Sequence, residues 1–188
     1  HRNHPEVEGT IGQLSEGKIT LVENKLDVAE LELDKNQKIA YITQTTLSVD
    51  DTKDIIKALK LRYPNIESSP KEDICYATTN RQNAIKKFAG KCDAFIVIGS
   101  NNSSNSNRLV EVASNAGCHN SVLLENKDFL DLELYKDANK IGISSGASVP
   151  DHLVMDVVKR FKNYFDIDIE NLELEKESVS FKLPKELR

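Results

Sequence analysis

The chain alternates short apolar runs with longer stretches in which apolar residues recur every three or four positions, the period of an α-helix. This pattern predicts four units, each a strand, a polar loop and an amphipathic helix. The predicted strands are the runs at 39–42, 74–77 and 141–143 and the start of "AFIVIGSNN". The loops that follow them are rich in hydroxyl and amide side chains, and read "TQTTLSVDD", "TTNRQ", "GSNNSSNSN" and "SSGASVP".

We expect one helix after each loop. The first begins near Asp50, the second has Thr79 and Gln82 at capping-box spacing, and the fourth has Pro150 in its first turn. The apolar faces of the four helices are expected to comprise Ile55, Ile56 and Leu59; Ala84, Ile85 and Phe88; Leu109, Val110, Val112 and Ala113; and Leu153, Val154, Val157, Val158 and Phe161.

Strands that alternate with helices predict right-handed βαβ units and therefore an α/β fold with small, mainly parallel sheets. The segment 63–73 has two prolines and no apolar period, so it is the predicted boundary between an α/β domain at 1–73 and a second at 74–165. The tail, 166–188, carries Val179, Phe181 and Leu183 in the alternation of an edge strand. All four polar loops would lie at the carboxyl ends of strands, where open α/β sheets bind ligands.

The composition argues against several classes of function. The formal net charge of -5, with the charged residues interspersed, argues against a nucleic-acid surface. The sequence contains no apolar run of about 18 residues and no secretion-signal pattern, so we expect no membrane association and a cytoplasmic location. Three cysteines without CxxC spacing indicate neither a disulfide framework nor a self-contained zinc site.

The polar loops favour an anion site. A helix N-terminus presents unpaired N–H groups and partial positive charge, and small hydroxyl and amide side chains can donate further hydrogen bonds to phosphate oxygens. The eight consecutive serines and asparagines at 100–107 are the strongest such loop. The alternative is structural, because Ser, Thr and Asn are also the preferred helix caps. Neither G-x-G-x-x-G nor a P-loop is present, which disfavours a nucleotide site.

Two further features carry candidate chemistry. Cys75 lies beside "ATTNR" and is either a small buried side chain or a ligand of a metal or cluster. His4 and Glu6 in "HPEVEG" pair an imidazole with a carboxylate at a spacing suited to proton transfer. A zinc deaminase is disfavoured because the downstream P-C-x-x-C is missing.

The motifs "HPEVEGTIGQ", "TQTTLSVDDT", "ICYATTNRQ", "GSNNSSNSNRL" and "SSGASVPDHLV", in this order, resemble the LytB/IspH family of 4-hydroxy-3-methylbut-2-enyl diphosphate reductases. The resemblance implies an iron–sulfur oxidoreductase of isoprenoid biosynthesis, in the methylerythritol phosphate pathway. Two electrons and two protons would convert (E)-4-hydroxy-3-methylbut-2-enyl diphosphate into isopentenyl and dimethylallyl diphosphates. A [4Fe-4S] cluster held by three cysteines and a ferredoxin or flavodoxin as electron donor are implied with it.

The resemblance also implies residue roles. Cys75 would be the last of the three cluster ligands, Glu6 the proton donor, and Thr45 the residue that hydrogen-bonds the substrate hydroxyl and relays the proton. His4 would lie at the diphosphate and assist proton delivery. The diphosphate itself would be bound by Ser103, Ser104, Asn105 and Ser148.

In this family the other two cluster cysteines, two substrate-binding histidines and an α/β domain precede "HPEVEG", and Cys92 and Cys118 do not stand in matching positions. The chain therefore resembles the second and third domains of a three-domain, trefoil-like enzyme, the second without its first strand. We expect that the 188 residues alone neither retain a cluster nor catalyse the reaction. A eukaryotic source would imply a plastid.

Two other functions remain open at this point. One is a non-catalytic α/β module that binds a phosphorylated metabolite without iron. The other is a structural or interaction domain whose loops only cap helices, which would have no measurable affinity for diphosphate.

Overall fold

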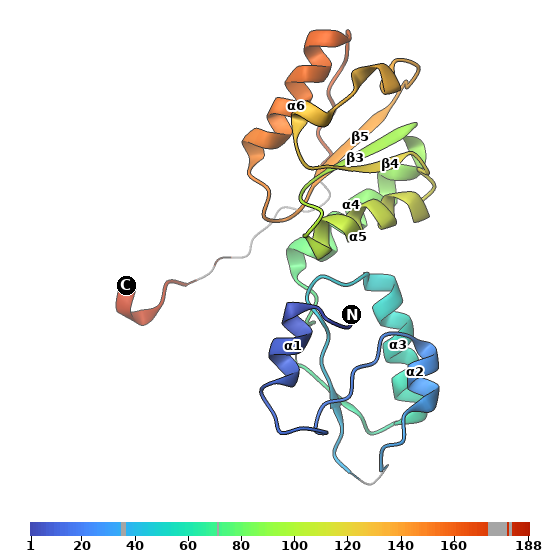
Figure 1. Cartoon of the computed structure of the whole chain (residues 1–188), viewed down its shortest axis with the longest axis vertical. Helices are drawn as coiled ribbons and strands as arrows, with labels where there is room; N and C mark the ends of the chain where they lie inside the picture. The colour runs from blue at the N-terminus through green and yellow to red at the C-terminus, as the bar shows by residue number, and fades with distance from the viewer. Residues whose placement is uncertain (35–36, 71, 173–179, 181) are drawn as a thin grey trace.

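The computed structural model describes residues 1–34, 37–70, 72–172, 180 and 182–188. Two bodies are stacked along the long axis, and the C-terminal segment extends away from both (Figure 1). The first body contains α1 (Pro5–Ile11), α2 (Lys25–Glu30), β1 (Ala40–Tyr41), α3 (Val49–Arg62) and β2 (Glu67–Ser68). The second contains α4 (Tyr76–Phe88), η1 (Ala89–Lys91), β3 (Ala94–Ile98), α5 (Ser104–Asn115), β4 (Ser121–Leu124), η2 (Lys127–Phe129), η3 (Leu132–Tyr135), β5 (Ile141–Ser145) and α6 (Asp151–Tyr164). A last short turn, η4 (Lys185–Leu187), ends the tail.

Both sheets are parallel, which confirms the predicted α/β class. β1 pairs with β2 in the first body. In the second, β3 lies between β4 and β5, with Phe95 opposite Ser121 on one side and Gly142 on the other. Parallel pairing brings the carboxyl ends of β3 and β5 to the same edge of the sheet, so the loops that follow them are neighbours.

The central strand β3 is buried along its whole length because helices cover both faces of its sheet. Phe95 and Val97 pack with α4 and α5 in one apolar cluster. Ala94, Ile96 and Ile98 point to the other face and pack with α6 and with the segment between β4 and β5. The uninterrupted apolar run of "AFIVI" is the sequence signature of this double coverage.

The first body has a smaller core. Val28, Leu31, Leu59 and Tyr63 are its buried apolar residues. The Tyr63 hydroxyl donates to the Leu31 carbonyl at 2.8 Å and so ties the end of α3 to the end of α2. The segment 63–73, predicted to be a domain boundary, begins with a core residue and contains β2. The domain limits at 73/74 and 165/166 stay predictions.

The prediction of a strand at 74–77 is wrong. Cys75 is the N-cap of α4, and the residues after it form the first turn of that helix. The strand that precedes α4 is β2, whose two residues are polar and exposed and therefore leave no hydrophobic signal. A short apolar run such as "ICYA" fits a helix start as well as a strand, because it is too short to display either period.

Two smaller predictions also need correction. Thr79 and Gln82 form no capping box, because α4 begins at Tyr76, three residues before Thr79, and the Cys75 side chain makes no cap hydrogen bond. Pro150 is the N-cap of α6, one residue before its first turn. Besides β2 and the short 3-10 turns, periodicity did not predict α1, α2 and β4; the first two have seven and six residues, too few to display an apolar stripe.

The two bodies are joined through α4. Gln82 is fully buried, its Nε2 donates to the Leu47 carbonyl at 2.8 Å, and its Oε1 accepts from the Val49 N–H at 3.0 Å. Both partners belong to the segment that leads into α3. Two ion pairs with exposed carboxylates, Lys86 with Asp50 and Arg108 with Asp51, lie along the same seam. Since exposed pairs contribute little, Gln82 is the stronger tie.

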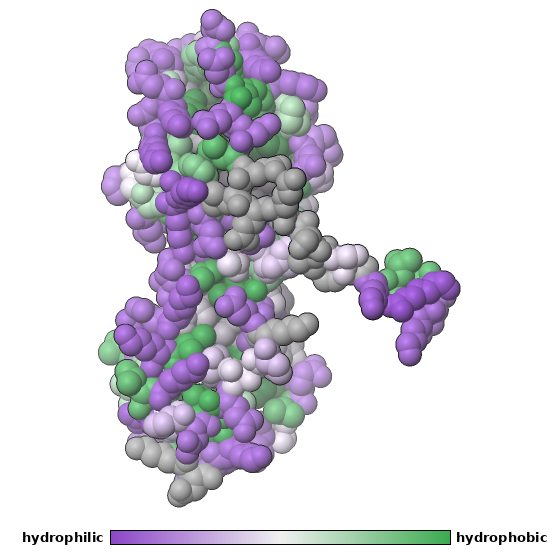
Figure 2. Space-filling view, turned by 180° about the vertical axis from the view of Figure 1, so that it is seen from behind, coloured by the Kyte–Doolittle hydropathy of each residue, from purple (hydrophilic) through white to green (hydrophobic). Residues whose placement is uncertain are grey.

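The surface seen from behind is mostly hydrophilic, with single hydrophobic residues scattered over both bodies and others at the end of the tail (Figure 2). Leu183 lies in that tail and is exposed, whereas Val179 and Phe181 lie outside the described residues, so the predicted edge strand stays a prediction. Within the described ranges, no helix has the length and apolar character needed to cross a bilayer.

We expect Gln82→Leu to lower the free energy of unfolding by about 2 to 4 kcal/mol, because it leaves the part-buried Leu47 carbonyl and Val49 N–H without their side-chain partner. Urea denaturation followed by circular dichroism measures the change. Asn83→Leu, one residue further along the exposed side of α4, is the control and should change stability by less than about 0.5 kcal/mol. Equal effects of the two substitutions would contradict the role assigned to Gln82.

Candidate functional site

Glu6 and Thr45, 39 residues apart in sequence, are in direct contact. The Thr45 backbone N–H donates to Glu6 Oε1 and Oε2 at 3.1 and 3.2 Å, and the Thr45 hydroxyl donates to Oε2 at 3.2 Å. Glu6 lies in the first turn of α1, and Thr45 lies in the loop 42–48 between β1 and α3. A carboxyl group beside a hydroxyl at this distance can pass a proton to it or through it.

His4 is the N-cap of α1 and is oriented by that role. Its Nδ1 accepts the Glu6 backbone N–H at 3.3 Å, so the proton of the neutral ring is on Nε2, the nitrogen that faces away from the helix end. The preceding Asn3 has a φ of 61°, in the left-handed region that Asn tolerates better than most residues. This sharp turn brings the N-cap imidazole and the Glu6 carboxylate to the same end of α1.

Cys75 joins the same group through its backbone. Its N–H donates to the Thr45 carbonyl at 3.0 Å, which places the half-buried thiol beside the loop 42–48. Cys92 and Cys118 lie beyond the far end of α4 and pack in the core of the second body. Among the described residues, no three His, Cys, Asp or Glu side chains gather as a metal site.

The donor set of the described residues therefore does not fit a [4Fe-4S] cluster, which needs thiolates from several cysteines. One thiol, that of Cys75, lies beside Thr45, and the other two cysteines of the chain are packed elsewhere. Burial raises the pKa of the Cys92 thiol, and the nearby Cys118 acts in the same direction, so Cys92 is a protonated thiol at neutral pH and a poor ligand.

The serine and asparagine run bridges the end of β3 and the start of α5. Ser103 is the N-cap of α5, and its Oγ accepts from the backbone N–H of Ser106 at 3.2 Å. Ser103, one of the four predicted diphosphate ligands, therefore has the helix-capping role that the structural alternative assigns to this loop. Capping does not exclude binding, because the Ser103 hydroxyl proton is not consumed by it.

Ser104 connects the two bodies at the site. Its Oγ accepts from the Thr46 hydroxyl at 3.0 Å, across 58 residues of sequence. The loop 42–48, which already contacts Glu6 and Cys75, thereby also contacts the first turn of α5. Of the predicted residues, Glu6, Thr45, Cys75 and Ser104 are therefore brought together by hydrogen bonds through one loop.

Asn105 follows in the same turn and is only 8% exposed. Its Oδ1 is buried without a hydrogen-bond partner among the described residues. A buried amide oxygen left unpaired is costly, and such a group in a native fold calls for an explanation. Ser148 is exposed in the loop after β5, at the same edge of the sheet as the loop after β3.

Two glycines at this edge were missed by sequence reasoning. Gly99 directly follows β3 and Gly146 directly follows β5, and a Cβ on either would overlap the Ser106 Oγ. The first turn of α5 therefore rests against the carboxyl ends of both strands. The available signal was the glycine after each of these two predicted strands, because glycine marks close approach of a backbone to another group.

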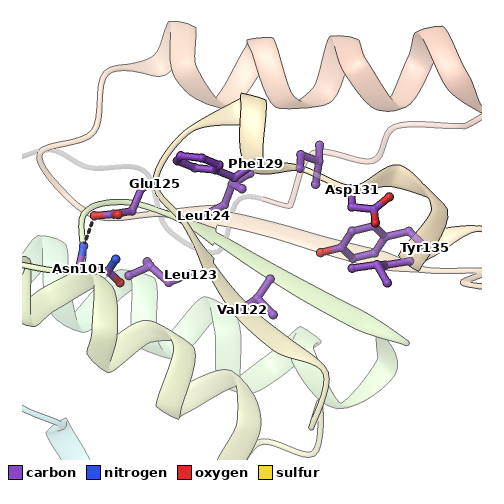
Figure 3. Close-up of a pocket in the computed structure, with 10 residues that line it drawn as sticks. Asn101, Val122, Leu123, Leu124, Glu125, Phe129, Asp131 and Tyr135 are labelled. Carbon is purple, nitrogen blue, oxygen red and sulfur yellow. Dashed lines mark hydrogen bonds between the residues drawn. The ribbon is translucent and has the colours of Figure 1, made fainter.

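Two cavities in the described part of the structure are lined by other residues. A cavity of about 340 Å³ lies along the edge strand β4, between Val122 and the side chains of Phe129 and Tyr135 (Figure 3). At one end of it the Asn101 N–H donates to Glu125 Oε1 at 2.7 Å. Another of about 300 Å³ lies between α3 and the segment 68–74. None of the described residues lining either cavity is a predicted site residue.

Fold and contacts together define a class: an α/β protein with parallel sheets, in which hydrogen bonds of the loop 42–48 join the Glu6 carboxylate, the Cys75 backbone and the first turn of α5. A family model described as LytB protein matches residues 1–162. The chain belongs to the LytB family.

The similar proteins are reductases. The 4-hydroxy-3-methylbut-2-enyl diphosphate reductases of Neisseria meningitidis serogroup C and Ruegeria pomeroyi are 51% and 50% identical over all 188 residues, which cover 58% and 60% of those proteins. The solved E-1-hydroxy-2-methyl-but-2-enyl-4-diphosphate reductase from Plasmodium falciparum matches with a TM-score of 0.91 and 39% identity, over 100% of this chain and 59% of that one. The chain thus spans about three fifths of the length of these relatives.

We expect alkylation of Cys92 by iodoacetamide to have a higher pH midpoint in the folded chain than in the same chain in urea. A raised pKa keeps the thiol protonated, so the reactive thiolate appears only at higher pH, above the ordinary value of about 8.5. Peptide mapping by mass spectrometry after timed labelling gives the rate for Cys92 alone. A folded midpoint equal to or below the unfolded one would show that burial does not control this thiol.

Proposed function

We propose that this chain forms the substrate-binding and proton-donating part of a 4-hydroxy-3-methylbut-2-enyl diphosphate reductase, an oxidoreductase of isoprenoid biosynthesis. The observation that carries the proposal is the contact between Glu6 and Thr45, because it joins two distant motifs into a proton-transfer pair. The relatives that bear this name are about half identical to the chain along its full length.

Diphosphate binding is assigned to the edge of the second sheet. Ser103, Ser104 and Asn105 stand at the N-terminus of α5, a helix of 12 residues, where unpaired N–H groups and the helix dipole favour an anion. Ser148 is added from the neighbouring loop after β5. Neutral donors around a diphosphate satisfy its oxygens without the lysine cluster that this sequence lacks there.

Proton delivery is assigned to Glu6, Thr45 and His4. In the proposed reaction the allylic C–O bond breaks, the oxygen leaves as water, and the carbon skeleton takes up two electrons and one proton. Glu6, as a carboxylic acid, supplies the proton to the departing oxygen through the Thr45 hydroxyl, which lies 3.2 Å from its Oε2. His4 presents its Nε2–H at the same end of α1, toward the diphosphate.

The electrons would come from a [4Fe-4S] cluster to which Cys75 contributes one ligand, reduced by a ferredoxin or a flavodoxin. The remaining thiolates would have to come from outside the 188 residues, since Cys92 and Cys118 pack away from Cys75. The expected location is the cytoplasm, or a plastid in a eukaryote.

A second candidate is favoured by this same shortage of thiols. A non-catalytic α/β module that binds a phosphorylated metabolite would use Ser103, Ser104 and Asn105 and need no cluster. It differs from the reductase in that it has no turnover of the substrate. Replacing Glu6 or Cys75 would therefore change neither its activity nor its affinity for the ligand.

We expect Glu6→Gln to lower kcat of the reductase about 10²- to 10⁴-fold, because a general acid is removed while the amide oxygen can still accept the Thr45 backbone N–H. The assay follows anaerobic reduction of the allylic diphosphate by the protein that carries this sequence. Glu8→Gln, exposed on the same helix, is the matched control and should retain activity. Unchanged kcat in Glu6→Gln would remove the proton-donor assignment.

We expect Asn105→Ala to weaken binding of inorganic diphosphate about 10- to 100-fold, because it removes the amide N–H donor of Asn105 at the N-terminus of α5, the equivalent of one hydrogen bond to a charged group. Isothermal titration calorimetry on the 188-residue chain tests this without any cluster or turnover. Asn115→Ala, exposed at the far end of α5, should bind as the parent does. A purely structural role for the loop predicts no affinity in the parent and a change in melting temperature only.

A further inference from the structure

We infer that Ser106 and Thr46 are positioning residues whose hydroxyls hold Ser103 and Ser104 as hydrogen-bond donors toward the bound anion. The inference rests on the diphosphate site proposed above and deepens it. It explains how two neutral serines become selective for an anion, because a hydroxyl can accept as readily as it donates unless its surroundings decide.

Ser106 determines the direction at Ser103. The Ser103 Oγ accepts the Ser106 backbone N–H at 3.2 Å and the Ser106 hydroxyl at 3.0 Å. A serine hydroxyl has two lone pairs and one proton, so two accepted bonds occupy both lone pairs. The remaining proton of Ser103 is left to donate, and its oxygen has no free lone pair with which to bind a cation or another donor.

The surroundings of Ser106 keep this arrangement in place. Ser106 is 1% exposed, and its hydroxyl lies between the backbones of Gly99 and Gly146. The glycines leave room for an oxygen and for little more. Because the site is closed to water, the Ser106 hydroxyl has no solvent partner to exchange for Ser103.

Thr46 determines the direction at Ser104 from the other body. Thr46 Oγ1 accepts from Gln44 Nε2 at 3.2 Å and donates to Ser104 Oγ at 3.0 Å. The Gln44 amide is itself oriented, since its Oε1 accepts from the backbone nitrogen of His1 at 3.1 Å. Thr46 Oγ1, which accepts from Gln44, can therefore donate its proton to Ser104, and the Ser104 proton is then free for an anion.

Both chains of donors end at consecutive residues at the N-terminus of α5, where the helix dipole already favours negative charge. Asn105, next in sequence, is buried in the same turn, and its side-chain N–H groups are the atoms that can donate to an anion. Oxygens of a diphosphate accept only, so they match hydroxyls whose protons are free to donate.

A double-mutant cycle tests the inference, with calorimetric titration of inorganic diphosphate into the 188-residue chain. Ser106→Ala removes one oxygen without adding volume, and we expect it to weaken binding about fivefold. In a Ser103→Ala background the same substitution should have no further effect, because Ser106 acts through Ser103. Ser114→Ala, on the same helix and away from its first turn, is the control.

Thr46→Val with Ser104→Ala forms a second, independent cycle with the same expected coupling. Thr46→Ser keeps the hydroxyl and should restore the affinity that Thr46→Val loses. If Ser106→Ala fails to fold, the Thr46 cycle carries the test.

The outcomes separate the two levels of the proposal. The positioning roles would be overturned if Ser106→Ala weakens diphosphate binding as much in the Ser103→Ala background as in the parent, and Thr46→Val as much in the Ser104→Ala background. They would also be overturned if neither substitution weakens binding while Ser103→Ala does. Either result would leave the diphosphate site standing. No affinity of the parent chain for inorganic diphosphate would overturn the site itself and the positioning roles with it. Coupling in both cycles, with rescue by Thr46→Ser, supports the inference.

Discussion

The site depends on the hydrogen bonds of one short loop, residues 42–48. The backbone of Thr45 is bound on both sides: its N–H donates to Glu6 and its carbonyl accepts from the N–H of Cys75. One residue later, Thr46 reaches Ser104 in the other body. The backbone groups of a loop need partners when they are buried, and here the partners are the functional groups themselves. The need to satisfy the loop therefore also assembles the site.

The same physics serves capping and binding. A helix N-terminus needs acceptors for its first N–H groups, and Ser103 supplies one for α5. The helix N-terminus also presents a positive potential and further N–H donors to any anion that approaches. The choice between a structural and a functional serine is thus not exclusive. A binding turn differs from an ordinary cap because it keeps donors that capping does not use, and the hydroxyl proton of Ser103 is such a donor.

Burial by tight backbone contact supports both functions. Gly99 and Gly146 let the first turn of α5 rest against the ends of β3 and β5, so the hydroxyl of Ser106 is held in a dry space between them. Gln82 holds the two bodies together in a similar way, because its buried side-chain amide hydrogen-bonds the carbonyl of Leu47 and the N–H of Val49. Hydrogen bonds in such surroundings are stronger than in water and costly to break, which makes them suitable for holding side chains in one arrangement.

The sequence by itself determined the α/β class, the four long helices and the central strand β3, because long periodic stretches and a five-residue apolar run carry strong signals. It also contained the motifs that identify the family and the residues Glu6, Thr45, Ser104 and Asn105. It did not show β2, whose two residues are polar, and it assigned "ICYA" to a strand although Cys75 caps a helix. Only the tertiary structure decided which of these residues meet. The bonds of Glu6 to Thr45 and of Thr46 to Ser104 cross 39 and 58 residues, and no local pattern encodes a contact at that separation. The Thr46 hydroxyl that bonds Ser104 likewise comes within hydrogen-bond distance only when the two bodies fold together.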